Sequence, residues 1–146
     1  MIEKRLTVGN KVPDIELQDA AGKTISLHSL SGKPVILYFW ASWNKDSRKA
    51  NKILKDLLTK QAKTEFAVYA VGLESYKELW TNAINNDKIQ DWVHVTDFLN
   101  IKSSAMSLFN IPEDLPYFFY LDNDLIIRYK GNDFGALESV LNRQIQ

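Results

Sequence analysis

A continuous apolar run, Pro-Val-Ile-Leu-Tyr-Phe-Trp-Ala-Ser-Trp, occupies residues 34–43. A run of β-branched and aromatic residues is typical of a central strand buried on both faces, so we expect a strand at Val35–Ala41. The polar residues after it indicate a helix start, with Asn44 as the cap and Asp46 in the first turn. Such a junction often positions chemistry, because the free N–H groups and the helix dipole favour an anion.

Residues 46–62 place apolar side chains at helical spacing, which predicts an amphipathic helix packed on a sheet. The expected inward positions are Ala50, Ile53, Leu54, Leu57, Leu58 and Ala62. The outer face is basic. Residues 44–64 contain seven Lys or Arg against two Asp, a balance of +5, whereas residues 65–146 contain six bases against twelve acids, a balance of −6. A basic helix face is more often a solvated surface than a binding patch.

A second buried strand is expected at Phe66–Leu73, and the strand–helix–strand order implies a right-handed parallel crossover. Ser75 is expected to cap the next helix in a capping box with Glu78, and Leu79 and Trp80 are expected on its inner stripe. Local patterns indicate further strands at 15–18, 24–27, 92–96, 117–121 and 125–129, and helices at 75–86, 103–108 and 133–145. Together these elements predict an α/β fold. A central mixed β-sheet is flanked by helices, with an N-terminal β-hairpin and a helical insertion.

Composition and charge exclude little. The chain of 146 residues fits one domain, residues 1–146, with residues 1–8 as a flexible lead-in. Its formal net charge of zero gives no global reason to expect nucleic-acid binding, and no stretch has the apolar length of a membrane span. No apolar signal core precedes Asn10. A fragment of an exported precursor would look the same, so the cell envelope and the cytoplasm both stay open.

Two motifs carry a resemblance to a known family. The first is Phe-Trp-Ala-Ser-Trp at residues 39–43, and the second is Leu-Pro opening an apolar stretch at residues 115–121. Together with the order of elements over residues 9–145, they resemble thioredoxin-like proteins of the TlpA/ResA type, which are related to the AhpC/TSA proteins. In that family the first motif precedes Cys-x-x-Cys, and Asn44 and Ser47 stand where its two cysteines would be. The resemblance implies a thioredoxin-like fold.

The missing sulfur determines what this site can do, because the chain contains no cysteine. The amide of Asn44 is neither nucleophilic nor oxidisable, and the hydroxyl of Ser47 is not ionised at neutral pH without a base beside it. Disulfide exchange at this site is therefore excluded by chemistry, no residue is assigned as catalytic, and no cofactor is expected. Tyr38 also occupies the strand position where thioredoxins themselves keep a buried carboxylate.

Other interpretations stay open. An enzyme of another class is compatible with the same fold, for example through a triad of Ser47 with His28 or His94, although serine and histidine alone do not indicate one. A metal site built from His28, His94, Asp91 or Asp97 has no ligand spacing behind it. Replacement of both cysteines in an oxidoreductase would also explain the sequence.

The resemblance further implies a peptide-binding groove between the helix start and a cis-proline, which predicts a cis Leu115–Pro116 bond. Backbone pairing to the residue before that proline needs no sulfur, so we expect the N–H and C=O of Leu115 to be free for an extended peptide. Trp43 is expected as a partly exposed cover. The function expected is a redox-inactive domain that binds protein or peptide, in an oligomeric state left open. The expected groove residues are Trp43, Asn44, Lys45, Asp46, Ser47, Leu115 and Pro116.

Overall fold

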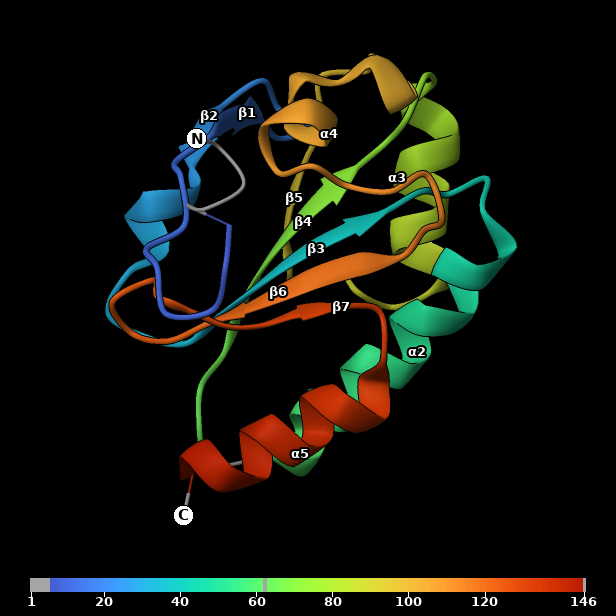
Figure 1. Ribbon diagram of the computed structural model, residues 1–146. Coiled ribbons are helices and arrows are strands. Elements are labelled where there is room, and N and C mark those ends of the chain that lie inside the picture. The colour runs from blue at the N-terminus through green and yellow to red at the C-terminus, as the bar shows by residue number, and fades with distance from the viewer. Residues whose placement is uncertain (1–5, 62, 146) are drawn as a thin grey trace.

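The computed structural model describes residues 6–61 and 63–145. A five-stranded sheet in the order β5-β4-β3-β6-β7 forms its centre, and a two-stranded hairpin, β1-β2, lies beside it (Figure 1). The strands are β1 (Glu16–Gln18), β2 (Thr24–Ser26), β3 (Val35–Trp40), β4 (Ala67–Gly72), β5 (Val93–Val95), β6 (Tyr117–Leu121) and β7 (Ile127–Gly131). The helices are η1 (Leu27–Leu30), α2 (Lys45–Lys60), α3 (Lys77–Asn86), η2 (Asn100–Lys102), α4 (Ser104–Leu108) and α5 (Phe134–Ile145).

The central strand β3 pairs with a parallel neighbour and an antiparallel one. Val35 lies opposite Ala67 of β4 in the parallel pair and opposite Leu121 of β6 in the antiparallel pair. Every residue of β3 is buried, as its apolar run predicted. The predicted mixed sheet, with β3 and β4 parallel at its centre and an antiparallel pair at one side, is confirmed.

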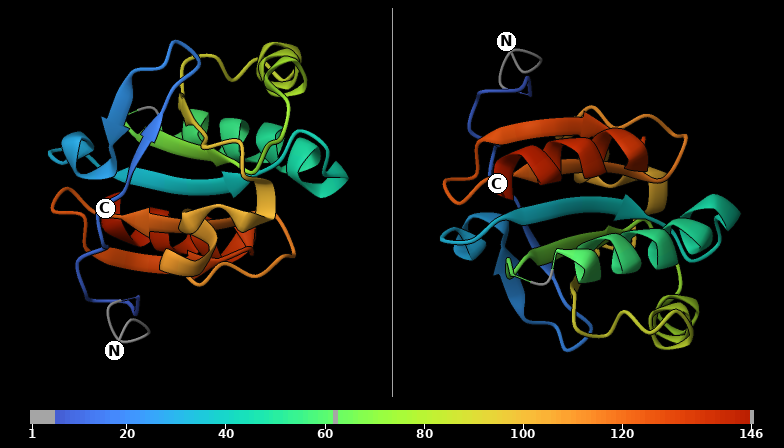
Figure 2. Two further views of the ribbon diagram at one scale, coloured as in Figure 1. Left: turned by 90° about the horizontal axis from the view of Figure 1, so that it is seen from above. Right: turned by 90° about the horizontal axis from the view of Figure 1, so that it is seen from below.

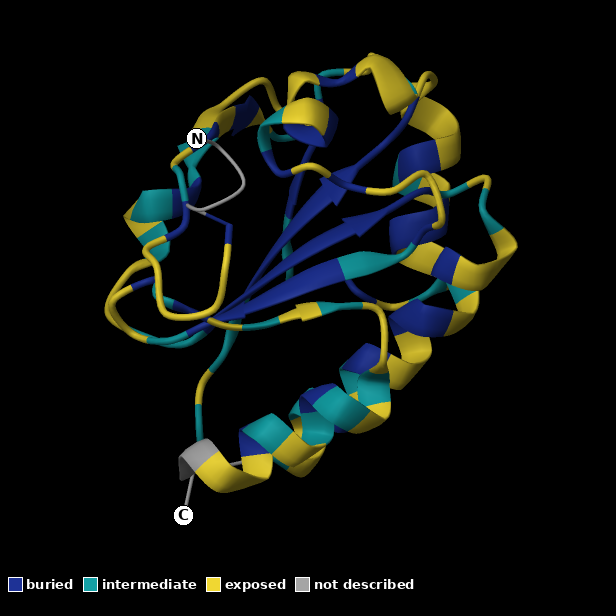
Figure 3. Ribbon diagram, viewed as in Figure 1, coloured by how far each residue is buried: buried dark blue, intermediate teal, exposed yellow. Residues whose placement is uncertain are grey.

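Two hydrophobic cores lie on opposite faces of the sheet, because successive β3 side chains point to opposite faces. Ile36, Tyr38 and Trp40 pack with residues of α2, α3 and α5, whereas Leu37 and Phe39 pack with residues of the hairpin and α4. Figure 2 shows α2 and α5 over one face of the sheet and the hairpin with α4 over the other, with α3 seen end-on beside the strands. Strands β3 to β6 are almost entirely buried between these layers, whereas the edge strand β7 is partly exposed (Figure 3). Within the described residues, no helix is long and apolar enough to cross a bilayer.

The chain just before β1 packs against the sheet. Residues 1–5 of the expected lead-in lie outside the described residues, but Leu6 and Val12 are buried in the core. The N–H of Gly9 donates to the carbonyl of Ile127 at 2.8 Å, and a bridge joins Lys11 to Ile126. Residues 9–12 therefore cover part of the edge strand β7.

Three local expectations differ from the structure. Ile53 and Leu79, expected to face inward, have exposed fractions of 48% and 54%. Helix α3 begins at Lys77 and not after Ser75, whose hydroxyl accepts a hydrogen bond of 3.0 Å from Asn100. No side chain caps α3, so the predicted capping box is not formed. Strand β7 begins two residues later than expected, since residues 122–126 form its turn.

Candidate functional site

The junction between β3 and α2 forms a capped helix start. Asn44 precedes the helix, and its Oδ1 accepts a hydrogen bond of 2.7 Å from the backbone N–H of Ser47. The carbonyl of Asn44 accepts the N–H of Arg48 at 3.1 Å. The predicted helix cap is confirmed. Because the side-chain oxygen holds the helix start, a structural role accounts for this amide.

The hydroxyl of Ser47 is fully buried under the first turn of α2. Its Oγ accepts a hydrogen bond of 3.2 Å from the backbone N–H of Ala41, which ties the helix to the end of β3. Ser47 therefore does not reach a ligand at the surface, and a structural role accounts for its hydroxyl as well.

Behind the helix start lies a chain of polar side chains, of which Tyr38 and Asn51 are buried and Arg48 and Asp87 are partly buried. The hydroxyl of Tyr38 donates to Oδ1 of Asn51 at 2.8 Å, and Nδ2 of Asn51 donates to Asp87 at 2.8 Å. Arg48 donates to both oxygens of the same carboxylate, at 2.7 and 2.9 Å. The carboxylate of this network belongs to Asp87, the residue directly after α3.

The pKa directions of Tyr38 and Asp87 agree with the hydrogen bonds of this network. Burial, assisted by the charge of Asp87, raises the pKa of Tyr38 well above its ordinary value. Partial burial opposes the ionisation of Asp87, but hydrogen bonds from Arg48 and Asn51 outweigh it and hold the pKa of that carboxyl below its ordinary value. At neutral pH Tyr38 is a neutral hydrogen-bond donor and Asp87 an anion, so the network holds no group poised to exchange a proton.

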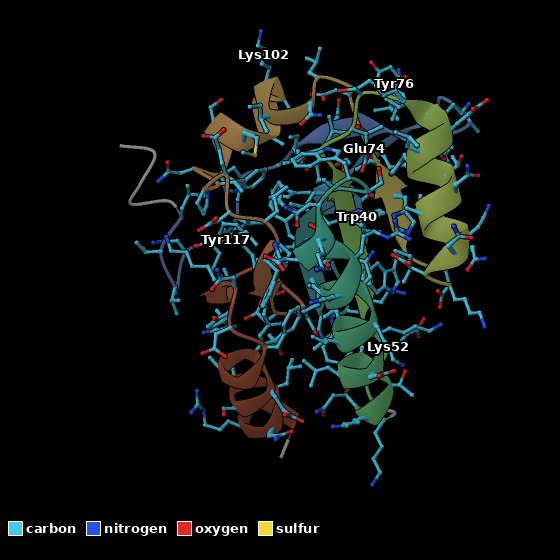
Figure 4. The ribbon with its side chains drawn as sticks, turned by 90° about the vertical axis from the view of Figure 1, so that its right-hand side faces the viewer. Trp40, Lys52, Glu74, Tyr76, Lys102 and Tyr117 are labelled. Atoms are coloured by element: carbon cyan, nitrogen blue, oxygen red, sulfur yellow. The ribbon has the colours of Figure 1, made fainter. Side chains whose placement is uncertain are left out.

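Glu74 is a buried carboxylate that our sequence analysis missed, with an exposed fraction of 1%. It accepts the backbone N–H of Ser42 at 2.7 Å and the hydroxyl of the same residue at 2.5 Å. Burial raises the pKa of Glu74, and the hydrogen bonds from Ser42 offset part of that effect. In Figure 4, Glu74 lies near Trp40 at the end of the sheet where α2 begins, and Lys52 lies farther along that helix. The available signal was its position directly after a buried strand.

Trp43 is the aromatic cover expected at this end of the sheet. Its side chain is 51% exposed, and its indole N–H donates to the carbonyl of Leu73 at 2.8 Å. One hydrogen bond therefore fixes the indole orientation while about half of the residue stays open to solvent. An exposed, oriented indole is suited to contact with another molecule.

A cleft of about 390 Å³ separates α2 from the loop that carries Leu115 and Pro116. The Leu115–Pro116 bond is cis, as predicted. The wall contains Asp46, Ile53, Leu115, Pro116, Asn132 and Phe134. We call this hollow the Pro116 cleft. It combines apolar side chains with carboxylate and amide groups, a lining suited to a short peptide segment.

The structure brings together only part of the expected groove. Asp46, Leu115 and Pro116 line the Pro116 cleft, whereas Trp43 and Asn44 lie outside its lining. The remaining two expected residues are Ser47, which is buried, and Lys45, which lines a different cleft.

The backbone of Leu115 differs from expectation. Its N–H donates to the carbonyl of Glu113 at 3.1 Å, so the loop itself uses the donor that we expected to be free. The Leu115 side chain is buried. Strand addition through that N–H is therefore not supported, and contact with the lining side chains is the interaction that this geometry offers.

The described residues form neither the serine triad nor the metal site that the sequence left open. Nε2 of His28 lies 2.8 Å from the carbonyl oxygen of Val12, and Nε2 of His94 lies 2.6 Å from that of Ile89. In the described residues, neither His28 nor His94 is hydrogen-bonded to the hydroxyl of Ser47, which accepts from Ala41. The serine triad is therefore not formed. Burial lowers the pKa of His94 to about 4, which leaves its ring neutral at neutral pH. Over residues 6–61 and 63–145, no group of three or more His, Asp or Glu side chains is placed to hold a metal ion.

Two curated proteins with similar sequences are a thioredoxin-like protein and a thiol-disulfide oxidoreductase. A thioredoxin-like protein of Haemophilus influenzae is 36% identical over 80 residues, which cover 54% of this chain and 46% of that protein. The thiol-disulfide oxidoreductase ResA of Bacillus thuringiensis is 26% identical over 83 residues, which cover 57% of this chain and 48% of the relative. The matches thus span about half the length of these curated relatives.

Solved structures match over nearly the full chain. A thiol-disulfide oxidoreductase from Bacteroides fragilis has a TM-score of 0.80 at 27% identity, covering 92% of this chain and 99% of that one. The C-terminal domain of a thiol-disulfide oxidoreductase from Bacteroides thetaiotaomicron has a TM-score of 0.82 at 24% identity, covering 97% of each chain, and supports the fold alone. The family model described as AhpC/TSA matches residues 8–130. The chain therefore belongs to the AhpC/TSA family, as a thioredoxin-like member that contains no cysteine.

Proposed function

We propose that this chain is a redox-inactive domain that binds an extended segment of a partner protein in the Pro116 cleft. The observation that carries the proposal is the cleft itself, where Asp46 at the start of α2 faces Leu115 and Pro116 across a hollow of about 390 Å³. Without a thiol, this end of the helix has no group for disulfide exchange. Peptide binding needs no thiol, so this site can still serve for binding.

The lining favours a short peptide that offers both apolar and polar groups. Ile53 and Phe134 supply exposed or half-buried apolar surface, and Asp46 and Asn132 supply oxygen acceptors that a peptide N–H can reach. The contact is through side chains, because the N–H of Leu115 is bonded to Glu113. An extended segment buries alternate side chains and leaves its N–H groups for such acceptors.

The experiment is a selection of peptides from a displayed random library against the immobilised domain, followed by affinity measurements on two variants. Asn132→Trp places an indole at the mouth of the cleft and is expected to weaken an enriched peptide at least about tenfold. Asn82→Trp, on the exposed face of α3, is the matched control and should bind like the wild type. Enriched peptides that bind both variants equally, or a selection that enriches none, would contradict the proposal.

A further inference from the structure

A second and larger cleft, of about 780 Å³, lies between α2 and the end of α3. It does not include Leu115 or Pro116, although Lys49 and Ile53 border both clefts. Its wall is dominated by cations, namely Lys45, Arg48, Lys49, Lys52, Lys55 and Lys88. We call this hollow the basic cleft.

Most of this positive charge is not neutralised within the domain. Arg48 is paired with Asp87 at 2.7 Å, and Lys52 with Asp56 at 3.5 Å. These are the two carboxylates in the wall of the cleft. The other cations, Lys45, Lys49, Lys55 and Lys88, form no ion pair in the part of the chain that the structure describes. An anion entering the cleft would therefore meet four uncompensated positive charges.

The stability of α2 does not explain why lysines occupy its first turns. Lys45 is the first residue of α2, where the helix dipole disfavours a positive charge, and Lys49 follows in the second turn. They are also four positions apart on one helix face, a spacing at which like charges repel each other. Each effect alone would favour an acidic or neutral residue at these positions. A bound anion reverses both effects, because it is attracted by the lysines and by the helix start.

Ile53 adds an apolar contact to the same wall. It is 48% exposed, although helical spacing placed it on the inner face of the helix. The alkyl stems of the surrounding lysines extend this apolar surface beneath their charged ends. A ligand that uses the whole wall therefore carries negative charges together with at least one apolar side chain.

We propose that the basic cleft binds an acidic segment of a partner protein, with its carboxylates between Lys45, Lys49 and Lys88 and an apolar side chain against Ile53. This proposal goes beyond the function proposed for the Pro116 cleft, with which the basic cleft shares only Lys49 and Ile53. A nucleic acid is disfavoured because the chain as a whole has a formal net charge of zero, and the cations sit on one cleft wall instead of along an extended stripe. A lipid surface is disfavoured because the cations line a hollow and not a protruding face.

The test uses a short fluorescein-labelled peptide of glutamates with one central leucine, and fluorescence anisotropy as the readout. The wild type is expected to bind, with an affinity that falls as salt is raised. The double variant Lys45→Glu with Lys88→Glu turns two attractions into repulsions and should weaken binding at least about tenfold. Both positions are exposed and border only the basic cleft, so the fold and the Pro116 cleft are left intact.

The matched control is Lys23→Glu with Lys130→Glu, which changes the net charge equally at exposed positions outside the cleft. It should bind within about twofold of the wild type. Equal losses in the two double variants would overturn the proposal by showing general charge attraction, and so would a wild type that does not bind. Tighter binding of phosphatidylserine vesicles or duplex DNA, lost only in the cleft variant, would overturn it in favour of that ligand class.

Two further comparisons make the assignment specific. Replacing the central leucine of the peptide by serine should weaken the wild type more than it weakens Ile53→Ser, because both changes remove the same contact. Asn132→Trp should leave the acidic peptide unaffected, which separates this cleft from the Pro116 cleft. Equal sensitivity of the wild type and Ile53→Ser to the leucine replacement, or a loss in Asn132→Trp, would overturn the placement.

Discussion

Glu74 accepts the backbone N–H of Ser42 at 2.7 Å, although the two residues are 32 positions apart in the chain. A buried carboxylate two residues after β4 thus holds the turn that leads from β3 into α2. This contact positions the helix start without help from a disulfide. The turn can therefore keep its geometry in a chain that has no cysteine.

Glu74→Ala should lower the free energy of unfolding by about 1–3 kcal/mol, because it leaves the partly buried N–H of Ser42 without its acceptor. Urea denaturation followed by circular dichroism measures the change. Glu78→Ala removes an exposed carboxylate from α3 and should change the free energy by less than about 0.5 kcal/mol. Equal effects of the two substitutions would contradict a structural role for Glu74.

Because Glu74 is buried, its carboxyl should make the free energy of unfolding fall as pH rises. Burial raises the pKa of this carboxyl, so the folded state holds the proton more tightly than the unfolded chain. The resulting stabilisation is present below the ordinary glutamate pKa and is lost as pH rises through the folded pKa. The wild type should therefore lose stability relative to Glu74→Gln as pH rises through that window. A difference in unfolding free energy that is constant, or that grows in favour of the wild type, would contradict this assignment.

Tyr38→Phe should destabilise the fold by about 1–2 kcal/mol, because Oδ1 of the buried Asn51 loses its donor. Chemical denaturation provides the measurement. Tyr76→Phe is the matched control, since that side chain is 69% exposed and its substitution should be nearly neutral. If Tyr38→Phe proved as mild as the control, the buried polar network behind α2 would not contribute to stability.

Restoring the sulfurs should restore redox chemistry. In the double variant Asn44→Cys with Ser47→Cys, the thiols stand at the start of α2, where the helix dipole stabilises a thiolate. We expect air oxidation to consume both thiols in an intramolecular disulfide, measured by thiol titration, and insulin reduction to appear. The wild type should show no reduction above buffer. A variant that oxidises yet stays inactive would show that the site has lost more than its sulfurs.

Features of the fold that depend on neighbouring residues could be predicted from the sequence. The apolar run of β3 and the cap at Asn44 follow from neighbouring residues, and both are confirmed. The placement of Ser75 could not be predicted, because its hydroxyl is engaged by Asn100, which lies 25 positions later.

The candidate site was less predictable than the fold for the same reason. The partners Arg48 and Asp87 are 39 positions apart, so their pairing appears only once α2 and α3 lie side by side. Likewise, the spacing rule that placed Ile53 inward takes no account of which face of α2 borders a cleft.

The most direct test of the central claim is a titration of the ¹⁵N-labelled domain with a peptide enriched in the library selection, followed by amide chemical shifts. A redox-inactive domain that binds in the Pro116 cleft should show the largest changes at Asp46, Leu115 and Asn132, which surround the cleft. The same titration of Asn132→Trp should abolish these changes. Changes confined to the hairpin and η1, on the other face of the sheet, would contradict the account.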